Sequence, residues 1–276
     1  MAFSDVAVVI LNYNSWKETL EEAKLVHDLF GLEWRQIIIV DNASPNESEQ
    51  ELGKKAIGEY VFIETGSNKG YASGNNIGLK YAFEHGYKYA WILNNDIIID
   101  DPDVLPEIIR VFRSDDKIAV VNPDVYAPDG YMFNRYAKRM SCWDYTFGHY
   151  SYKKKGRDLE MKDGFGYIWR PQGCCMVVDL NKISSVGYLD ENTFLYCEEP
   201  ILAEKLISAG YRLACACKVK IVHNHSKTVN SVYKKKEKIK VHNKSFEYYL
   251  KQYRKFNLFQ VKLCLFFAYL EIRFTD

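Results

Sequence analysis

The sequence lacks the features of a secreted, zinc-ribbon or membrane-spanning protein. Its seven cysteines are odd in number and include no Cys-x-x-Cys pair, which argues against a disulfide framework and a zinc ribbon. The first residues, MAFSDVAVVILNYN, contain no basic stretch or cleavage site, so we interpret them as a core strand rather than a signal peptide. No window reaches the roughly 18 apolar residues that a membrane-spanning helix needs. We therefore expect a protein of a reducing, cytoplasmic compartment.

The chain as a whole also has little net charge. Its formal net charge is +1 over 276 residues, which gives little information about partners. The charges are distributed unevenly, however, because residues 234–262 contain ten lysines and arginines against two glutamates. The rest of the chain is therefore net acidic. Such asymmetry indicates a surface partner for the basic end.

What the sequence does contain is a set of short apolar runs rich in β-branched residues. They lack polar alternation, which is typical of strands buried on both faces of a parallel sheet. Segments with helical end signals lie between them, so the order predicts an α/β fold with right-handed βαβ connections. The runs are Val6 to Leu11, Ile37 to Val40, Tyr60 to Ile63, Tyr89 to Leu93, Ile118 to Val121 and Cys174 to Val178.

The helix ends are predicted from their capping residues. Serine followed three residues later by glutamate forms a capping box, proline favours the first helical turn, and glycine favours the position after the last turn. The predicted helices run from a capping box at Ser15 to Glu18 as far as Gly31, from Asn75 to Gly86, from Asp101-Pro102 onward, and from Pro200 to Gly210.

Polar residues follow four of the predicted strands. A single polar strand end is as easily explained by a helix cap or a turn. In parallel sheets, however, ligands bind beyond the carboxyl ends of the strands, so four such ends at one rim predict a binding site. The four segments are Asn12-Tyr13-Asn14, Asp41-Asn42-Ala43-Ser44, the glycine-rich ETGSNKGYASGNN at residues 64–76, and Asn94-Asn95-Asp96.

The order of these motifs resembles glycosyltransferase family 2, whose members have the GT-A fold, and especially its bacterial rhamnosyltransferase-like branch. The resemblance implies a mostly parallel central sheet in a GT-A domain at residues 1–230. The nucleotide-binding half is expected at about 1–122 and the acceptor-side half at about 123–230, followed by a basic, aromatic helical extension at 231–276. The matching stretches span residues 6 to about 228: VVILNYNS, IIIVDNAS, GSNKGYASGNNIGL, WILNNDIII, RPQGCCMVV, GYLDENTFLYCEEPILAEKLISAGYRL and VHNHSKT.

The resemblance further implies an inverting, metal-dependent glycosyltransferase. Such an enzyme would move a sugar from a UDP- or dTDP-sugar to a hydroxyl of a glycan or lipid-linked acceptor in bacterial surface polysaccharide biosynthesis. A divalent metal, Mn²⁺ or Mg²⁺, usually neutralises the leaving diphosphate. The Asp-x-Asp metal motif of the family is Asn94-Asn95-Asp96 here, so Asp96 is the expected direct ligand. His223 is the second expected ligand, with His225 as its substitute.

An inverting transferase needs a carboxylate that takes the proton of the acceptor hydroxyl. The family places it in an acidic pair before a helix, which implies Glu199 as the base and Glu198 as the second choice. If Pro200 is the first helical residue, Glu199 lies at the N-cap, where the helix dipole favours its charge. A later acid of the family pattern is absent, because Ile201 occupies its position.

The remaining expected contacts bind the nucleotide-sugar. Asp41 is expected to accept a hydrogen bond from the N3–H of uracil or thymine. The glycines of the third segment allow close approach of the backbone, and a helix that starts at Asn75 favours anions. The other residues expected to contact the donor are Leu11, Asn12, Tyr13, Asn68, Lys69, Gly70, Gly74, Asn75, Asn94, Asn95, Arg170 and Gly173.

Two interpretations of the tail, residues 234–274, remain open. It could lie in a membrane interface with its lysines facing anionic lipid, or it could pack as a helical pair on the core or on a second subunit of a homodimer. No recognisable nucleic-acid-binding module accompanies the charge, so we expect no nucleic-acid partner.

Two other function classes compete with a glycosyltransferase. A sugar-nucleotide nucleotidyltransferase would place a glycine-rich, basic loop after the first strand, where this chain has Asn12-Tyr13-Asn14-Ser15. A non-catalytic GT-A-like binding module would have no need of Asp96 and Glu199.

Overall fold

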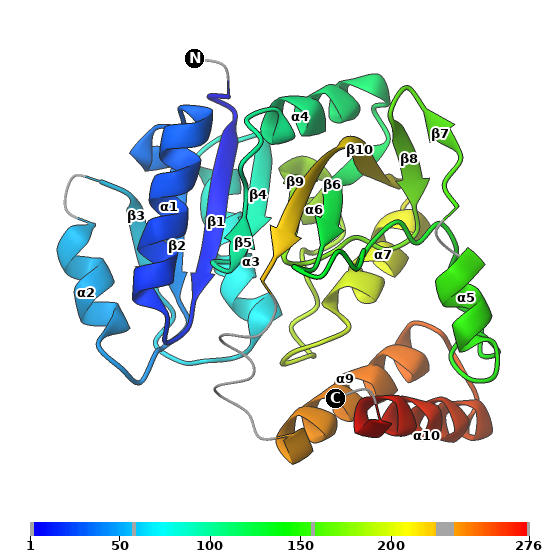
Figure 1. Ribbon diagram of the computed structural model, residues 1–276. Coiled ribbons are helices and arrows are strands. Elements are labelled where there is room, and N and C mark those ends of the chain that lie inside the picture. Colours follow the sequence, from blue (N-terminus) through cyan, green and yellow to red (C-terminus); the bar gives the residue numbers. More distant parts are fainter. Residues whose placement is uncertain (1–2, 57–58, 156–157, 225–234, 275–276) are drawn as a thin grey trace.

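A computed structural model describes residues 3–56, 59–155, 158–224 and 235–274 (Figure 1). Within these residues, ten strands form one sheet in the order β3-β2-β1-β4-β9-β6-β10-β8-β7, with β5 paired to β10. The strands are β1 (Val6–Asn12), β2 (Ile37–Asp41), β3 (Val61–Glu64), β4 (Tyr89–Leu93), β5 (Ile97–Ile98), β6 (Ile118–Tyr126), β7 (Met161–Lys162), β8 (Phe165–Ile168), β9 (Cys175–Asp179) and β10 (Arg212–His223).

The strand directions agree with the expected mostly parallel sheet. Strands β3, β2, β1 and β4 are mutually parallel, and β10 is parallel to β6. Strand β9 lies between β4 and β6 and is antiparallel to both, so β6 and β10 point the same way as β1. The carboxyl ends of β1, β2, β4 and β10 therefore meet at one edge, which is the lower edge in Figure 1.

Helices cover both faces of the sheet. Alternate residues of β1 belong to different apolar clusters: Val8 lies in the cluster that includes residues of α1 and α4, and Val9 lies in the cluster that includes residues of α3 and α7. Burial on both faces explains why the strands are continuously apolar. The helices are α1 (Trp16–Phe30), η1 (Trp34–Gln36), α2 (Ser48–Lys55), α3 (Tyr71–Glu84), α4 (Val104–Ser114), α5 (His149–Lys155), α6 (Leu180–Ser185), α7 (Glu198–Ser208), α9 (Lys235–Gln252) and α10 (Leu258–Phe274).

The first helix has the predicted bounds but not the predicted capping box. Gly31 ends α1 with φ 64°, as expected. Ser15 occupies the N-cap position, yet its side chain caps no backbone N–H. The side-chain amide of Asn95 instead donates to Ser15 Oγ at 2.8 Å. The hydroxyl that the local pattern assigned to the helix end is thus used in a contact with a residue 80 positions away.

Three other predicted helix starts are wrong. Helix α3 begins at Tyr71, so Asn75 lies in its second turn. Helix α4 begins at Val104 with Asp103 at the N-cap, which leaves Pro102 outside. Helix α7 begins at Glu198 after Cys197, whose φ is 68°, so Glu199 is the second helical residue rather than the N-cap.

The C-terminal segment is a helical hairpin of α9 and α10 that packs on the rest of the chain. Tyr249, Leu250, Val261 and Cys264 are buried in the same apolar cluster as α3 and α7. Figure 1 shows the hairpin below the edge toward which β1 and β10 point. The tail is thus a helical pair packed on the core, which is one of the interpretations left open by the sequence, and contact with a membrane stays a prediction. None of the helices in the described part of the chain is both long enough and apolar enough to cross a membrane.

Candidate functional site

The ends of β1 and β2 carry a buried polar cluster around Asp41, whose side chain is wholly buried. The Asn12 amide donates to Asp41 Oδ1 at 2.6 Å, and the Ser44 hydroxyl donates to the same oxygen at 2.7 Å. The backbone N–H of Ser44 donates to Oδ2 at 2.9 Å. Both carboxylate oxygens are thus already engaged within the protein.

This cluster continues to the end of β4 through α1. The Thr19 hydroxyl donates to Asn12 Oδ1 at 2.8 Å, and the Asn95 amide donates to Thr19 Oγ1 at 2.7 Å. The side chain of Asn95, a predicted donor contact, is therefore occupied by α1. Hydrogen bonds in a buried network hold one another in place, so three strand ends form one rigid rim.

The glycine-rich segment uses its glycines mainly for contact between backbone elements. Gly70 has φ 98°, and a Cβ there would lie 2.1 Å from the carbonyl oxygen of Phe194. A Cβ on Gly74 would lie 2.4 Å from Cδ1 of Leu11. These glycines bring α3 against β1 and against the loop before α7, which is a structural reason for their presence.

The polar residues of this segment lie beside the rim. Asn68 Oδ1 accepts from the Asn42 amide at 3.1 Å and from the Gly70 N–H at 3.0 Å. The Asn75 amide is turned back along the helix and donates to the Tyr71 carbonyl at 3.0 Å. Lys69 is exposed to solvent.

A cavity of about 420 Å³ brings together six of the predicted site residues. It lies at the carboxyl edge of the sheet, between the start of α7, the end of β10 and the C-terminal hairpin. The sequence did not predict the part of the cavity lining that the hairpin forms, because contacts between segments far apart in the chain leave no local pattern. The predicted residues in its lining are Asn94, Arg170, Gly173, Glu198, Glu199 and His223, and the further ones include Tyr71, Tyr145, His149, His242, Phe246, Tyr249 and Glu271.

Glu199 is held in this cavity by the backbone. The N–H of Gly173 donates to Glu199 Oε1 at 3.2 Å. The Tyr71 hydroxyl donates to the Gly173 carbonyl at 2.8 Å and so fixes the same peptide. A Cβ on Gly173 would lie 3.2 Å from Glu199 Oε1, so glycine gives the carboxylate room to approach.

The neighbouring acid, Glu198, has a raised pKa. It is buried, and among the described residues its Oε1 has no hydrogen-bond partner. Burial, and then the negative charge of Glu199, raise the pKa of Glu198 to about 8. Glu198 is therefore mostly protonated at neutral pH. For Arg170, burial opposes the charge, but Glu199 and nearby tyrosines raise its pKa overall.

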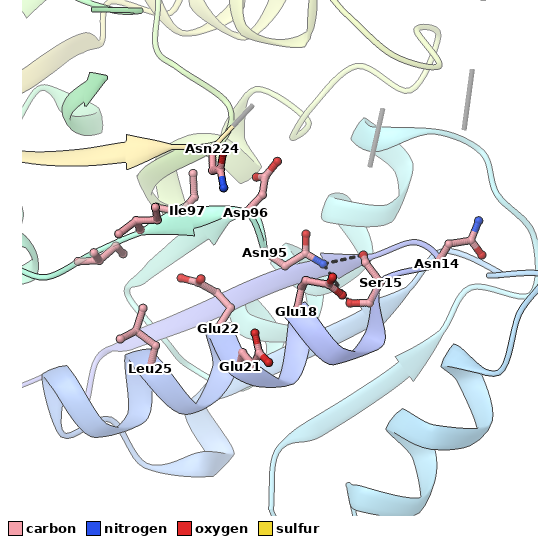
Figure 2. A pocket seen from close by; sticks show the side chains of 12 residues that line it. Asn14, Ser15, Glu18, Glu21, Glu22, Leu25, Asn95, Asp96, Ile97 and Asn224 are labelled. Atoms are coloured by element: carbon pink, nitrogen blue, oxygen red, sulfur yellow. Dashed lines mark hydrogen bonds between the residues drawn. The ribbon is translucent and has the colours of Figure 1, made fainter. Parts of the chain in front are cut away.

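Asp96 and His223, the two predicted metal ligands, lie against each other. Asp96 Oδ1 is 3.1 Å from His223 Nε2, and the histidine is buried. Asp96 lines a second cavity, of about 590 Å³, between α1 and β5 (Figure 2). The pair thus separates this α1-side cavity from the cavity that contains Glu199.

The chemistry of this pair fits a divalent cation. Within the described residues, Asp96 Oδ1 is buried and makes no hydrogen bond of normal geometry despite its proximity to the imidazole. Carboxylate oxygen and imidazole nitrogen are both ordinary ligands of Mn²⁺. A trio that sequence reasoning missed, Asp124, Cys215 and Cys217, also has ligand atoms close together, but the Arg135 guanidinium already binds Asp124 with an Nε–Oδ1 distance of 2.7 Å.

The mixed sheet with flanking helices has the GT-A fold, which it shares with solved structures of low sequence identity. The mannosyltransferase PcManGT from Pyrobaculum calidifontis, solved with GDP-Man and Mn²⁺, has a TM-score of 0.61 at 14% identity, covering 98% of this chain and 70% of that one. GalNAc-T7, solved with UDP, GalNAc and Mn²⁺, has a TM-score of 0.60 at 15% identity, covering 90% of this chain and 50% of that one.

The particular family follows from the sequence match. Residues 7–175 match the family described as glycosyl transferase family 2, and the chain belongs to that family. A low-salt glycan biosynthesis hexosyltransferase, Agl10, of Haloferax volcanii is 24% identical over 196 residues, 71% of this chain and 59% of that protein. A poly-β-1,6-N-acetyl-D-glucosamine synthase of Staphylococcus aureus is 25% identical over 217 residues, 75% of this chain and 47% of that protein. The chain thus spans about half to three-fifths of the length of these relatives.

Proposed function

We propose that the protein is a metal-dependent, inverting glycosyltransferase that uses a UDP- or dTDP-sugar. The observation that carries this proposal is the meeting of Glu199 and the Asp96–His223 pair at the carboxyl edge of the sheet, where one cavity is lined by Glu199 and His223. Membership of family 2 and the likeness to folds solved with sugar nucleotides and Mn²⁺ support it.

The proposed chemistry assigns one role to each acid. Glu199 accepts the proton of the acceptor hydroxyl as its oxygen bonds to the anomeric carbon. The bond between that carbon and the diphosphate oxygen breaks on the opposite side, which inverts the configuration. A divalent cation held by Asp96 and His223 would neutralise the charge of the departing diphosphate. Glu198, whose pKa is raised by burial, keeps its proton near neutral pH and is not the proposed base.

The nucleotide is proposed to bind along residues 1–122, at the rim of β1, β2 and β4. We retain Asp41 as the residue that reads the pyrimidine N3–H. Because the Asp41 side chain is wholly buried, direct contact with the base requires a neighbouring side chain to move aside. The proposal therefore includes a side-chain rearrangement on donor binding.

The acceptor is proposed to bind between residues 123–230 and the C-terminal extension. Tyr145 and Phe246 pack with ring centroids 5.2 Å apart in the cavity wall, and His242 lies beside them. Aromatic faces with a nearby polar group suit the apolar and hydroxyl-bearing faces of a sugar ring. We propose a glycan or lipid-linked acceptor of surface polysaccharide assembly, used at the inner face of the cell membrane.

Donor hydrolysis tests this proposal. The full chain is incubated with a panel of UDP- and dTDP-sugars and Mn²⁺, and release of UDP or dTDP is measured. We expect slow release with one donor and its loss in Asp96→Ala. Asp100→Ala, the same change at an exposed acid four residues away, should retain it.

Two results would replace the proposal. Release of pyrophosphate from a nucleoside triphosphate and a sugar phosphate would identify a nucleotidyltransferase. Stabilisation of the fold by a nucleotide-sugar, with neither hydrolysis nor transfer, would identify a binding module.

A further inference from the structure

One side of the C-terminal hairpin exposes a band of large apolar residues with lysines beside them. We call it the aromatic–lysine face. Its apolar members are each more than half exposed, from 56% for Phe266 to 74% for Phe259. The face comprises Trp143 and Phe147 of the segment before α5, Leu258, Phe259 and Phe266 of α10, and Lys255 and Lys262.

The two segments that build this face are packed together. Trp143 and Phe147 have ring centroids 5.5 Å apart, and Phe147 lies 4.8 Å from Phe267 of α10. Nearer the start of α10, the sulfur atoms of Cys142 and Cys264 are 3.8 Å apart. The face is therefore one continuous surface rather than scattered exposed side chains.

Helix α10 is apolar on two opposite sides. Val261 and Cys264 are buried toward the core, and Leu258, Phe259 and Phe266 point outward. A helix that is apolar all round is normally buried, and a large exposed apolar patch marks an interaction site. The outward side of α10 is thus expected to be covered by something that the isolated chain does not supply.

The charges on the face select the class of partner. Lys255 and Lys262 are exposed. The nearby acid Glu271 contacts His149 and Lys153, at 3.1 Å and 2.7 Å, so within the described residues it does not neutralise the face. Lysine is depleted in protein interfaces, and the acid between Trp143 and Phe147, Asp144, is partly buried and accepts hydrogen bonds from the backbone N–H and hydroxyl of Ser141. A bilayer surface with anionic headgroups accepts both the aromatic rings and the lysines.

We propose that the aromatic–lysine face binds the surface of an anionic lipid bilayer, with its aromatic side chains at headgroup level. The same hairpin lines the Glu199 cavity through His242, Phe246 and Ala268. Docking would therefore hold that cavity close to the lipid surface. The inference depends on the exposed face and does not depend on the proposed function.

Vesicle co-sedimentation of the full chain tests the inference. We expect binding to vesicles of equal parts phosphatidylcholine and phosphatidylglycerol, little binding to phosphatidylcholine alone, and release at high salt. The double variant Lys255→Glu/Lys262→Glu should lower the partition coefficient about tenfold or more, because each basic residue near an anionic surface contributes to it. Phe259→Ser/Phe266→Ser should also lower the partition coefficient, because it removes apolar side chains from the membrane-facing surface.

Matched variants on other elements serve as controls. Lys117→Glu/Lys162→Glu and Phe83→Ser change exposed residues outside the face and should retain binding. Circular dichroism checks that every variant is folded. Failure of the parent chain to bind anionic vesicles, or equal losses in the controls, would overturn the proposal. A dimer in light scattering that Phe259→Ser/Phe266→Ser dissociates, without vesicle binding, would assign the face to a second copy instead.

Discussion

The backbone N–H of Gly173 donates a hydrogen bond to Oε1 of Glu199 at 3.2 Å. This contact joins the loop before β9 to the first turn of α7 and orients the proposed base toward the cavity. The other carboxylate oxygen, Oε2, is the one that we propose meets the acceptor hydroxyl.

The first prediction concerns Glu199. Glu199→Gln should lower the rate of sugar transfer by about 10²–10⁴-fold, which is the usual contribution of a general base. The affinity for the nucleotide-sugar, measured by calorimetry, should change little. A transfer rate within a factor of about three of the parent would show that another group takes the proton.

The second prediction concerns the pH dependence of stability. The pKa of Glu198 is about 8 in the folded chain and near 4.5 when the chain is unfolded. Above about pH 4.5 the unfolded state releases this proton more readily, so the parent loses stability progressively up to about pH 8. Glu198→Gln removes this loss and should be more stable than the parent by a few kcal/mol near pH 8, with the difference shrinking toward pH 5. Urea unfolding of both proteins across this range measures it. A difference that does not depend on pH would contradict the assignment.

The third prediction concerns Gly74. Gly74→Ala places a Cβ 2.4 Å from Cδ1 of Leu11 and should destabilise the fold by about 1–3 kcal/mol through overpacking. Leu11→Ala combined with Gly74→Ala should recover part of that loss, because the smaller side chain relieves the clash. Thermal unfolding of the two single variants and the double variant gives the coupling energy. Strict additivity would show that the two residues do not meet.

The fourth prediction concerns the attachment of the hairpin. Asp190 Oδ2 accepts from the hydroxyls of Tyr248 and Tyr253 at 2.9 Å and 2.6 Å. Tyr248→Phe/Tyr253→Phe should remove about 1–3 kcal/mol of hairpin docking. Hydrogen exchange in α9 should then accelerate, and exchange in β1 and β2 should not. Equal acceleration throughout the chain would mean that the hairpin and the sheet unfold as one unit.

The sheet and its rim were predictable because they depend on local signals. Continuous β-branched runs indicated strands buried on both sides, and polar residues at their ends indicated a site. The start of α3 was not predictable in the same way. Gly74 is a poor helix former, but the close packing of α3 on Leu11 outweighs that preference.

The missed part of the candidate site depends on distant pairings. The Ser15 hydroxyl was predicted to cap α1, but it accepts a hydrogen bond from the Asn95 side chain instead. The wall formed by His242 and Phe246 exists only because the hairpin folds back over the sheet edge. Neither contact follows a periodic sequence pattern. The composition of the tail predicted that it has a partner, but it did not predict that the tail lines the cavity.

The hydrogen bonds that run from Asn95 through Thr19 to Asn12 have a direction. A threonine hydroxyl has a single hydrogen, and Thr19 gives it to Asn12, so Asn95 must present its NH₂ group and Asn12 its carbonyl oxygen. The NH₂ group of Asn12 is then committed to Asp41. The chain of bonds therefore ties the orientation of the Asn12 amide, beside Asp41, to that of the Asn95 amide, next to Asp96 in the sequence.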